Sequence, residues 1–204
     1  MTADDLTFEA LMARIVRTLR DPIGEARALL AENPPYQARV LGLLTVVAIS
    51  AAIGTVFQLL IQVLAKTDDP GGAMAIYFAP VQLVVLIVMA FMMFFMGQRF
   101  GGTGRFEDAL LLVVWMQFIL VVGQGVLTLA MIFFPVAASI FTLVLVGLMF
   151  WLLTYFTAAL HGFDNFVATG LGVVLTFFGT VIFFGMILGM ILGALGIAPV
   201  AVAP

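Results

Sequence analysis

The sequence contains no cysteine and very little charge. The absence of cysteine from its 204 residues excludes disulfides, zinc–thiolate sites and cysteine-held iron–sulfur clusters. Asp, Glu, Lys and Arg together make up 9% of the residues, whereas hydrophobic residues make up 64%. A soluble domain typically has about 25% charged residues, so this composition excludes a soluble globular protein. The sequence therefore predicts an integral membrane protein.

Long uncharged stretches predict where the chain crosses the membrane. About 20 apolar residues in a helix cross the hydrocarbon core, which is about 30 Å thick. The uncharged run over residues 109–163 is too long for one crossing, and Pro135 divides it, because proline removes a backbone donor and clashes with the preceding turn. We predict a tight hairpin there. The expected fold is all-α and polytopic, with five transmembrane helices at residues 40–65, 73–96, 109–134, 137–160 and 167–195.

The basic residues predict the orientation. All of the eight Lys and Arg residues except Lys66 fall before the first span or in the second loop. Because basic residues are retained in the cytoplasm, the N-terminus is expected inside and the C-terminus outside. We predict a multi-pass protein of a bacterial inner membrane, with a cytoplasmic arm at residues 1–39, a transmembrane domain at 40–196 and a short periplasmic tail at 197–204.

The arm has the periodicity of an amphipathic helix over residues 6–20. Arg14, Arg17 and Thr18 fall away from its apolar stripe. The stripe could lie in the inner headgroup layer, pack on the chain's own helices or loops, or bind a partner. Asp21-Pro22 should end this helix, and a second short helix is expected at residues 23–31. The stripe consists of Phe8, Leu11, Met12, Ile15, Val16 and Leu19.

The predicted spans carry no obvious chemistry. No ionisable residue lies in the middle of any span, which argues against a proton- or ion-coupled transporter. The sequence shows no nucleophile–base pair, no carboxylate dyad and no cluster with metal-ligand spacing. We therefore expect a non-enzymatic protein with no catalytic residues, no cofactor, no metal site and no nucleic-acid partner.

The polar residues at membrane depth have two interpretations. They could form hydrogen bonds between helices, which is the ordinary role of such residues. Alternatively, they could line a polar cavity for a lipid headgroup or a small solute, together with Pro80, which is expected to kink the second span. The most polar are Gln58, Gln62, Gln82, Gln117 and Gln124.

The only histidine, His161, lies at the end of the fourth span. We expect its side chain to bond to the last carbonyls of its own helix, with Gly162 as the C-cap. A pH-sensitive contact is the alternative.

Glycines mark two further segments. In the second loop, the glycines between Arg99 and Arg105 should permit a tight reversal, and the two arginines could contact anionic lipid headgroups. In the fifth span, Gly185, Gly189 and Gly193 recur at four-residue spacing, which places them on one face and lets another helix approach closely. That helix could belong to the same chain, to a second copy or to another protein.

Several segments resemble the bacterial branch of the Yip1 family. They are GQRFGGTGRFEDA at 97–109, WMQF at 115–118, LRDP at 19–22 and LHGF at 160–163. The resemblance extends over essentially the whole chain and agrees with the five-helix topology. It implies a role in membrane organisation, trafficking or scaffolding, with membrane lipids, other membrane proteins or further copies of the chain as partners.

The leading hypothesis is therefore a non-enzymatic scaffold, assembly factor or accessory subunit. The alternative is a transporter or channel for a small solute or lipid, with a polar path near Pro80 and the buried glutamines. A water-accessible cavity at membrane depth would favour the transporter, and a solidly packed bundle would favour the scaffold.

Overall fold

The computed structural model describes residues 7–66 and 71–194, and within these ranges all regular secondary structure is α-helical. Five of the helices are long and apolar enough to cross a membrane, which confirms the predicted number of spans. The predicted tail at 197–204 and the expected end of the fifth span at residue 195 lie outside the described residues. The helices are α1 (Phe8–Arg20), α2 (Pro22–Glu32), α3 (Tyr36–Ala65), α4 (Gly71–Arg99), α5 (Phe106–Phe133), α6 (Pro135–His161) and α7 (Phe166–Ala194).

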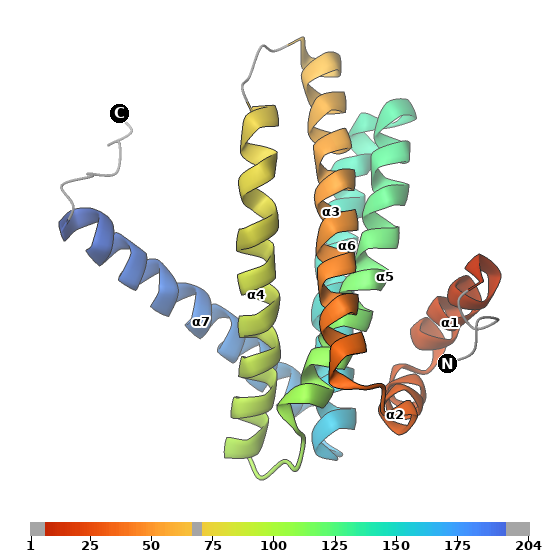
Figure 1. Ribbon diagram of the computed structural model, residues 1–204, viewed down its shortest axis with the longest axis vertical. Coiled ribbons are helices and arrows are strands. Elements are labelled where there is room, and N and C mark those ends of the chain that lie inside the picture. Colours follow the sequence, from red (N-terminus) through yellow and green to blue (C-terminus); the bar gives the residue numbers. More distant parts are fainter. Residues whose placement is uncertain (1–6, 67–70, 195–204) are drawn as a thin grey trace.

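Helices α3 to α6 form an up-and-down bundle, and α7 leaves it at a steep angle (Figure 1). The start of α3, the loop between α4 and α5, and the turn between α6 and α7 all lie at the same end of the bundle (Figure 1). We call this the basic end, because Arg39, Arg99 and Arg105 belong to these segments. The arm formed by α1 and α2 lies on the side of the bundle away from α7 (Figure 1).

Proline and a capping aspartate set two of the helix boundaries. Asp21 ends α1, and its carboxylate accepts a hydrogen bond of 2.9 Å from the Gly24 N–H to begin α2. Pro22 and Pro135 both occupy the first turn of a helix, where a proline loses no intrahelical bond. Only Phe134 separates α5 from α6. The predicted break at Asp21-Pro22 and the predicted hairpin at Pro135 are both confirmed.

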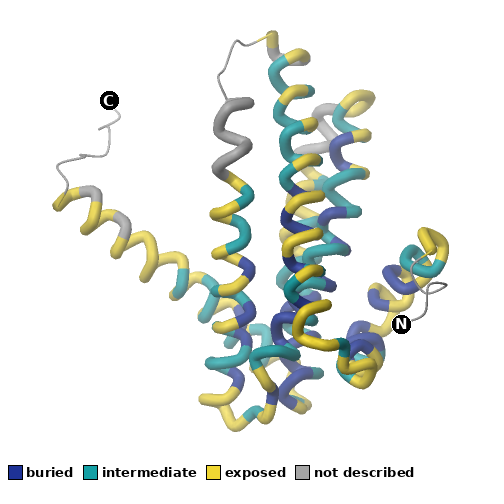
Figure 2. Tube along the Cα trace, viewed as in Figure 1, coloured by how far each residue is buried: buried dark blue, intermediate teal, exposed yellow. Residues whose placement is uncertain are grey.

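The core surrounds α5 and lies toward the basic end. In the most apolar 18-residue stretch of α5, half of the residues are buried inside the chain. The corresponding share is 17% for α4 and 0% for α7. The largest fully buried side chains there include Leu112, Met116, Leu152 and Phe156, from α5 and α6. Figure 2 shows the buried stretches gathered toward the basic end, whereas α7 is exposed along most of its length. The centre of the bundle is therefore α5, and its outlier is α7.

A small polar cluster joins three spans at membrane depth. The amide Nε2 of Gln82 donates to Ser50 Oγ at 3.0 Å, and this hydroxyl donates to Gln124 Oε1 at 3.2 Å. The cluster thereby ties α4 to α3 and α3 to α5. Interhelical hydrogen bonding, the ordinary interpretation of the glutamines, is confirmed for these two, and each such bond contributes about 0.6 kcal/mol.

Helix α1 buries only part of its apolar stripe. Of the stripe, Ile15 is buried and Leu11 and Met12 pack partly buried against the core, but Phe8, Val16 and Leu19 are exposed by 77%, 46% and 43%. Packing of the whole stripe on the chain's own helices is therefore not observed. Arg14 and Thr18, which lie away from the stripe in the sequence pattern, are buried instead.

Partners from α2 and α5 explain why polar residues of α1 are buried. The guanidinium of Arg14 donates to Glu25 Oε1 at 2.6 Å and to the carboxylate of Glu32, and its Cζ lies 5.4 Å from the centre of the Trp115 ring. Trp115 Nε1 donates to Thr18 Oγ1 at 3.0 Å. Burial alone would lower the pKa of Arg14, but the bonds to Glu32 and Glu25 outweigh it and raise the pKa overall. Arg14 stays charged, and α1 docks on α5 through this cluster.

Candidate functional site

The basic end of the bundle is closed around the His161 ring. His161 is 4% exposed, and its Nδ1 accepts a hydrogen bond from the Gly104 N–H at 3.1 Å. Because Nδ1 accepts, the ring proton belongs on Nε2, which lies 3.1 Å from the carbonyl oxygen of Met93. One imidazole thus connects the end of α6 to α4 and to the loop between α4 and α5.

Glycines provide the space for this ring. A Cβ added at Gly97 or Gly102 would lie 2.1 or 2.2 Å from a ring nitrogen of His161, and one added at Gly104 would lie 2.5 Å from Leu160 Cγ. The tight reversal needs a positive φ at Gly101 alone, where φ is 86°. The other glycines of the loop were expected to serve the turn, but the structure shows that they admit a side chain.

The prediction that Gly162 is the C-cap was correct, but the prediction that the His161 ring bonds to carbonyls of its own helix was wrong. Gly162 is the C-cap, with φ of 74° and its N–H bonded to the carbonyl of Ala158 at 2.8 Å. The ring, however, bonds to α4 and the loop and not to carbonyls of its own helix. The lone His together with the spacing Gly97, Gly102 and Gly104 is the sequence signal that indicates the enclosure.

Arg39 is a second connection at the basic end that the sequence reasoning missed. Its side chain is 1% exposed and donates to Asp108 at 2.8 Å, to Asn33 Oδ1 at 2.9 Å and to the carbonyl of Pro34 at 2.9 Å. These bonds join the end of the arm, the start of α3 and the start of α5. In the sequence, Arg39 only marks the edge of a span, since nothing local pairs it with Asp108.

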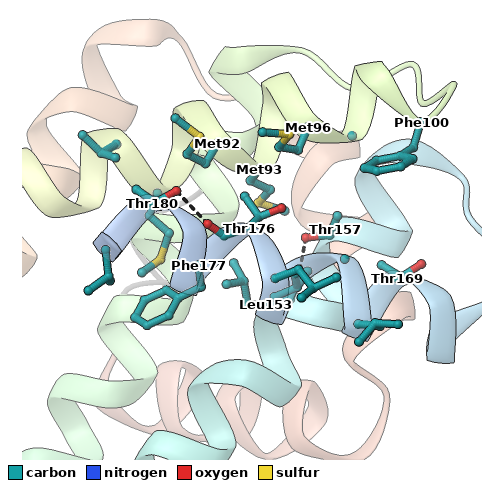
Figure 3. A pocket seen from close by; sticks show the side chains of 18 of the residues that line it. Met92, Met93, Met96, Phe100, Leu153, Thr157, Thr169, Thr176, Phe177 and Thr180 are labelled. Carbon is teal, nitrogen blue, oxygen red and sulfur yellow. Dashed lines mark hydrogen bonds between the residues drawn. The ribbon is translucent and has the colours of Figure 1, made fainter. Parts of the chain in front are cut away.

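A groove of about 1040 Å³ lies between α4 and α7 in the described part of the chain. Its α4 wall runs from Pro80 to Phe100, its α7 wall from Ala168 to Phe184, and Leu153 and Thr157 of α6 also line it. Figure 3 shows Met92, Met93 and Met96 on one side of the groove. The groove exists because α7 diverges from the bundle.

The groove offers few free polar atoms. The hydroxyls of Thr157, Thr169 and Thr180 donate to carbonyls of their own helices at 2.6, 2.9 and 2.7 Å, as Figure 3 shows for Thr157 and Thr180. Pro80 lines the groove, but none of the five glutamines does, although all five lie in the described part of the chain. The structure therefore does not bring Pro80 and the glutamines together into a polar path.

The glycine face of α7 has no partner within the described part of the chain. A Cβ added at Gly185, Gly189 or Gly193 would meet no atom within 4 Å. Packing of these glycines against another helix of the same chain is therefore not observed. Gly189 follows Thr180 by nine residues, which at about 3.6 residues per turn places it on the side of α7 opposite the groove.

Comparison with known families decides which family this architecture represents. The model of the Yip1 domain matches residues 16–187, from within α1 to near the end of α7. The chain belongs to the Yip1 family. Neither a curated protein nor a solved structure matches it significantly.

The Yip1 match covers the His161 enclosure, Arg39 and the whole groove. Gly185 lies within the matched range, but Gly189 and Gly193 lie beyond it. Because the match begins at Val16, inside α1, part of the arm belongs to the Yip1 domain as well as the five spans.

The two arginines of the Yip1 loop lie exposed at the basic end. Arg105 donates to Glu107 at 2.9 Å in a pair exposed on both sides, and Arg99 stacks on Phe95 with its Cζ 4.9 Å from the ring centre. Contact of Arg99 and Arg105 with anionic lipid headgroups stays a prediction. Among the described residues, no group of three or more His, Asp or Glu side chains could hold a metal ion, and every buried side-chain nitrogen or oxygen has a hydrogen-bond partner.

Proposed function

We propose that this Yip1 protein is a non-enzymatic scaffold, assembly factor or accessory subunit, and that it binds other membrane proteins through α7. The observation that carries the proposal is the exposure of the second half of α7, since its first half packs on α6 through Val173, Phe177 and Phe178. The most apolar 18-residue stretch of α7 contains no buried residue, whereas half of the residues in the corresponding stretch of α5 are buried. A span that packs so little on its own chain is free to pack on another.

The glycine face makes α7 suited to helix association. Helices in lipid associate through close packing, because lipid tails are as apolar as their side chains. Three glycines on one face allow a second backbone to approach closely, and no atom of the described chain occupies that space. Lipid alone gives no reason for glycines at these positions, since glycine costs about 1 kcal/mol relative to alanine within a helix.

We place the protein in a bacterial inner membrane, with its basic end and N-terminus in the cytoplasm and its C-terminus in the periplasm. The distribution of Lys and Arg supports this orientation, since only Lys66 lies at the other end of the bundle. The scaffold would then present Arg99 and Arg105 to the cytoplasmic headgroup layer.

The transporter alternative has less support. A path for a polar solute requires free polar atoms along a continuous hollow, but Gln82 and Gln124 bond within the bundle and the groove is almost entirely apolar. The proposal is therefore made for the scaffold.

Site-specific cross-linking tests the proposal. Because the chain has no cysteine, a single introduced cysteine gives one defined probe. Gly189→Cys, labelled with a thiol-reactive benzophenone and irradiated in native membranes, should yield a discrete higher-mass product, because the photoprobe inserts into C–H bonds of a helix beside it. Ile187→Cys, which lies about 200° around the same helix, is the matched control and should yield little. Equal products from the two positions, or none from Gly189→Cys, would refute α7 as the binding face.

A further inference from the structure

We propose that the groove between α4 and α7 binds one glycerophospholipid of the surrounding bilayer, with its acyl chains along the methionine-rich wall and a zwitterionic headgroup at the basic end. This site is on the side of α7 opposite the glycine face. The lipid site and the scaffold proposal can therefore fail independently.

The dimensions of the groove suit a long amphiphile. Small-molecule pockets reach about 1000 Å³ at most, and this groove of about 1040 Å³ extends along α4 from Pro80 to Phe100. At 1.5 Å per residue that wall is about 30 Å long, which is close to the thickness of the hydrocarbon core. The hollow is elongated along the direction in which acyl chains lie.

The walls suit flexible aliphatic chains. Met89, Met92, Met93 and Met96 line the α4 side together with valines. Methionine side chains have several rotatable bonds and adapt to ligands of variable shape, as disordered acyl chains are. Three of the four lining threonines use their hydroxyls in bonds to backbone carbonyls, so Thr176 is the lining threonine whose hydroxyl has no such bond. A polar solute that left water for this groove would find almost no groups to replace the hydrogen bonds it had made with water.

The α4 wall is poorly suited to a partner helix, although the α7 wall does carry small residues at Ala168, Gly172, Thr176 and Thr180. Helix interfaces in membranes are enriched in small residues that let the backbones approach. The part of α4 that faces the groove instead presents Val81, Val84, Val85 and the four methionines. Gly185, Gly189 and Gly193, in the last turns of α7, are not among the residues that line the groove.

Charge at one end of the groove provides complementarity for the headgroup. Asp164 and Asn165 line the groove at the basic end, and the Asp164 carboxylate is exposed. Arg99 stacks on Phe95 and does not line the groove, but it follows Met92 by seven residues and so lies on nearly the same face of α4, just beyond the groove. An exposed carboxylate and a guanidinium at the same end match the ammonium and phosphate of a zwitterionic aminophospholipid. An anionic lipid would place its net charge beside Asp164 and should bind less well.

The first test fills the groove without disturbing the protein. Gly172 lines the groove, and a Cβ there would meet no atom within 4 Å, so Gly172→Phe should occupy the space of the lipid. Val174→Phe adds the same side chain two residues later, outside the groove lining, and is the matched control. The lipid retained by each purified protein is measured by native mass spectrometry after exchange in nanodiscs of phosphatidylethanolamine and phosphatidylglycerol.

We expect one phosphatidylethanolamine per wild-type chain, at least tenfold lower retention in Gly172→Phe and a change of less than twofold in Val174→Phe. Asp164→Asn should lose the preference for phosphatidylethanolamine while retaining a lipid. Thermal melting of each variant establishes that it is folded. Wild-type retention in Gly172→Phe, equal loss in both phenylalanine variants, or a second copy of the chain in place of the lipid would overturn the proposal.

Discussion

At the scale of single residues, two side chains organise the basic end, and each does so by satisfying groups on other helices. His161 accepts a hydrogen bond from the Gly104 N–H, and its other ring nitrogen lies beside the Met93 carbonyl. Arg39 donates hydrogen bonds to Asp108, Asn33 and the carbonyl of Pro34. Neither role follows from neighbouring residues in the sequence, since the partners are up to 69 positions away. What could be read locally was the glycine spacing and the cap at Gly162.

We expect His161→Ala to lower the free energy of unfolding by about 2–4 kcal/mol, because it leaves a cavity and removes two hydrogen-bond partners. Gly97→Ala should also destabilise, since its Cβ would lie 2.1 Å from the ring. In the double variant His161→Ala, Gly97→Ala, the alanine at position 97 no longer meets an imidazole ring. The two losses in unfolding free energy should therefore be less than additive in a double-mutant cycle, measured by thermal or denaturant unfolding in detergent.

Gly147→Ala is the matched control for this cycle. Gly147 lies within α6, and an added Cβ meets nothing within 4 Å. The variant should be neutral or slightly stabilising because alanine is the better helix former. Full additivity of His161→Ala and Gly97→Ala would contradict the enclosure.

At the scale of helices, the arm shows where periodicity fails as a guide to packing. The apolar stripe of α1 predicts a helix correctly, but packing selects Arg14 and Thr18 because α2 supplies two carboxylates and α5 supplies Trp115. The exposed Phe8, Val16 and Leu19 remain available to lipid or to a partner. A charged side chain can be buried when oppositely charged and hydrogen-bonding groups are buried beside it. The sequence pattern of one helix cannot reveal those groups, because they belong to other helices.

We expect Arg14→Gln to undock the arm without unfolding the bundle, because Glu25 and Glu32 lose their shared partner at a cost of about 2–3 kcal/mol. Limited proteolysis within residues 8–32 should accelerate at least tenfold. Arg20→Gln, an exposed position on the same helix, should cleave at the wild-type rate. Equal cleavage of both variants would show that the Arg14 cluster does not hold the arm.

At the scale of the whole molecule, composition and proline positions were enough to predict five spans and their order. The angle of α7 could not be predicted, because a uniformly apolar helix has no polar face to indicate which side meets the bundle. The groove follows from that angle, so the sequence could not reveal it either. Only the glycine spacing marked α7 as unusual.

We expect the N-terminus and the loop between α4 and α5 to be cytoplasmic. A reporter active only in the periplasm should be active when fused after Pro204 and silent when fused within residues 100–105. The opposite pattern would reverse the orientation and place the Asp164 end of the groove in the outer leaflet.

The proposed display of α7 for association with another membrane protein can be tested on the glycine face. In Gly189→Leu the new side chain meets no atom of its own chain, so the melting temperature of the isolated protein should stay within about 2 °C of the wild type. The complex extracted from native membranes in mild detergent should become smaller on a native gel, because the leucine keeps the partner backbone away. Ile187→Leu should leave both properties unchanged. A large drop in melting temperature with the complex intact would instead show that the glycine face packs within the chain and that α7 does not bind a partner through it.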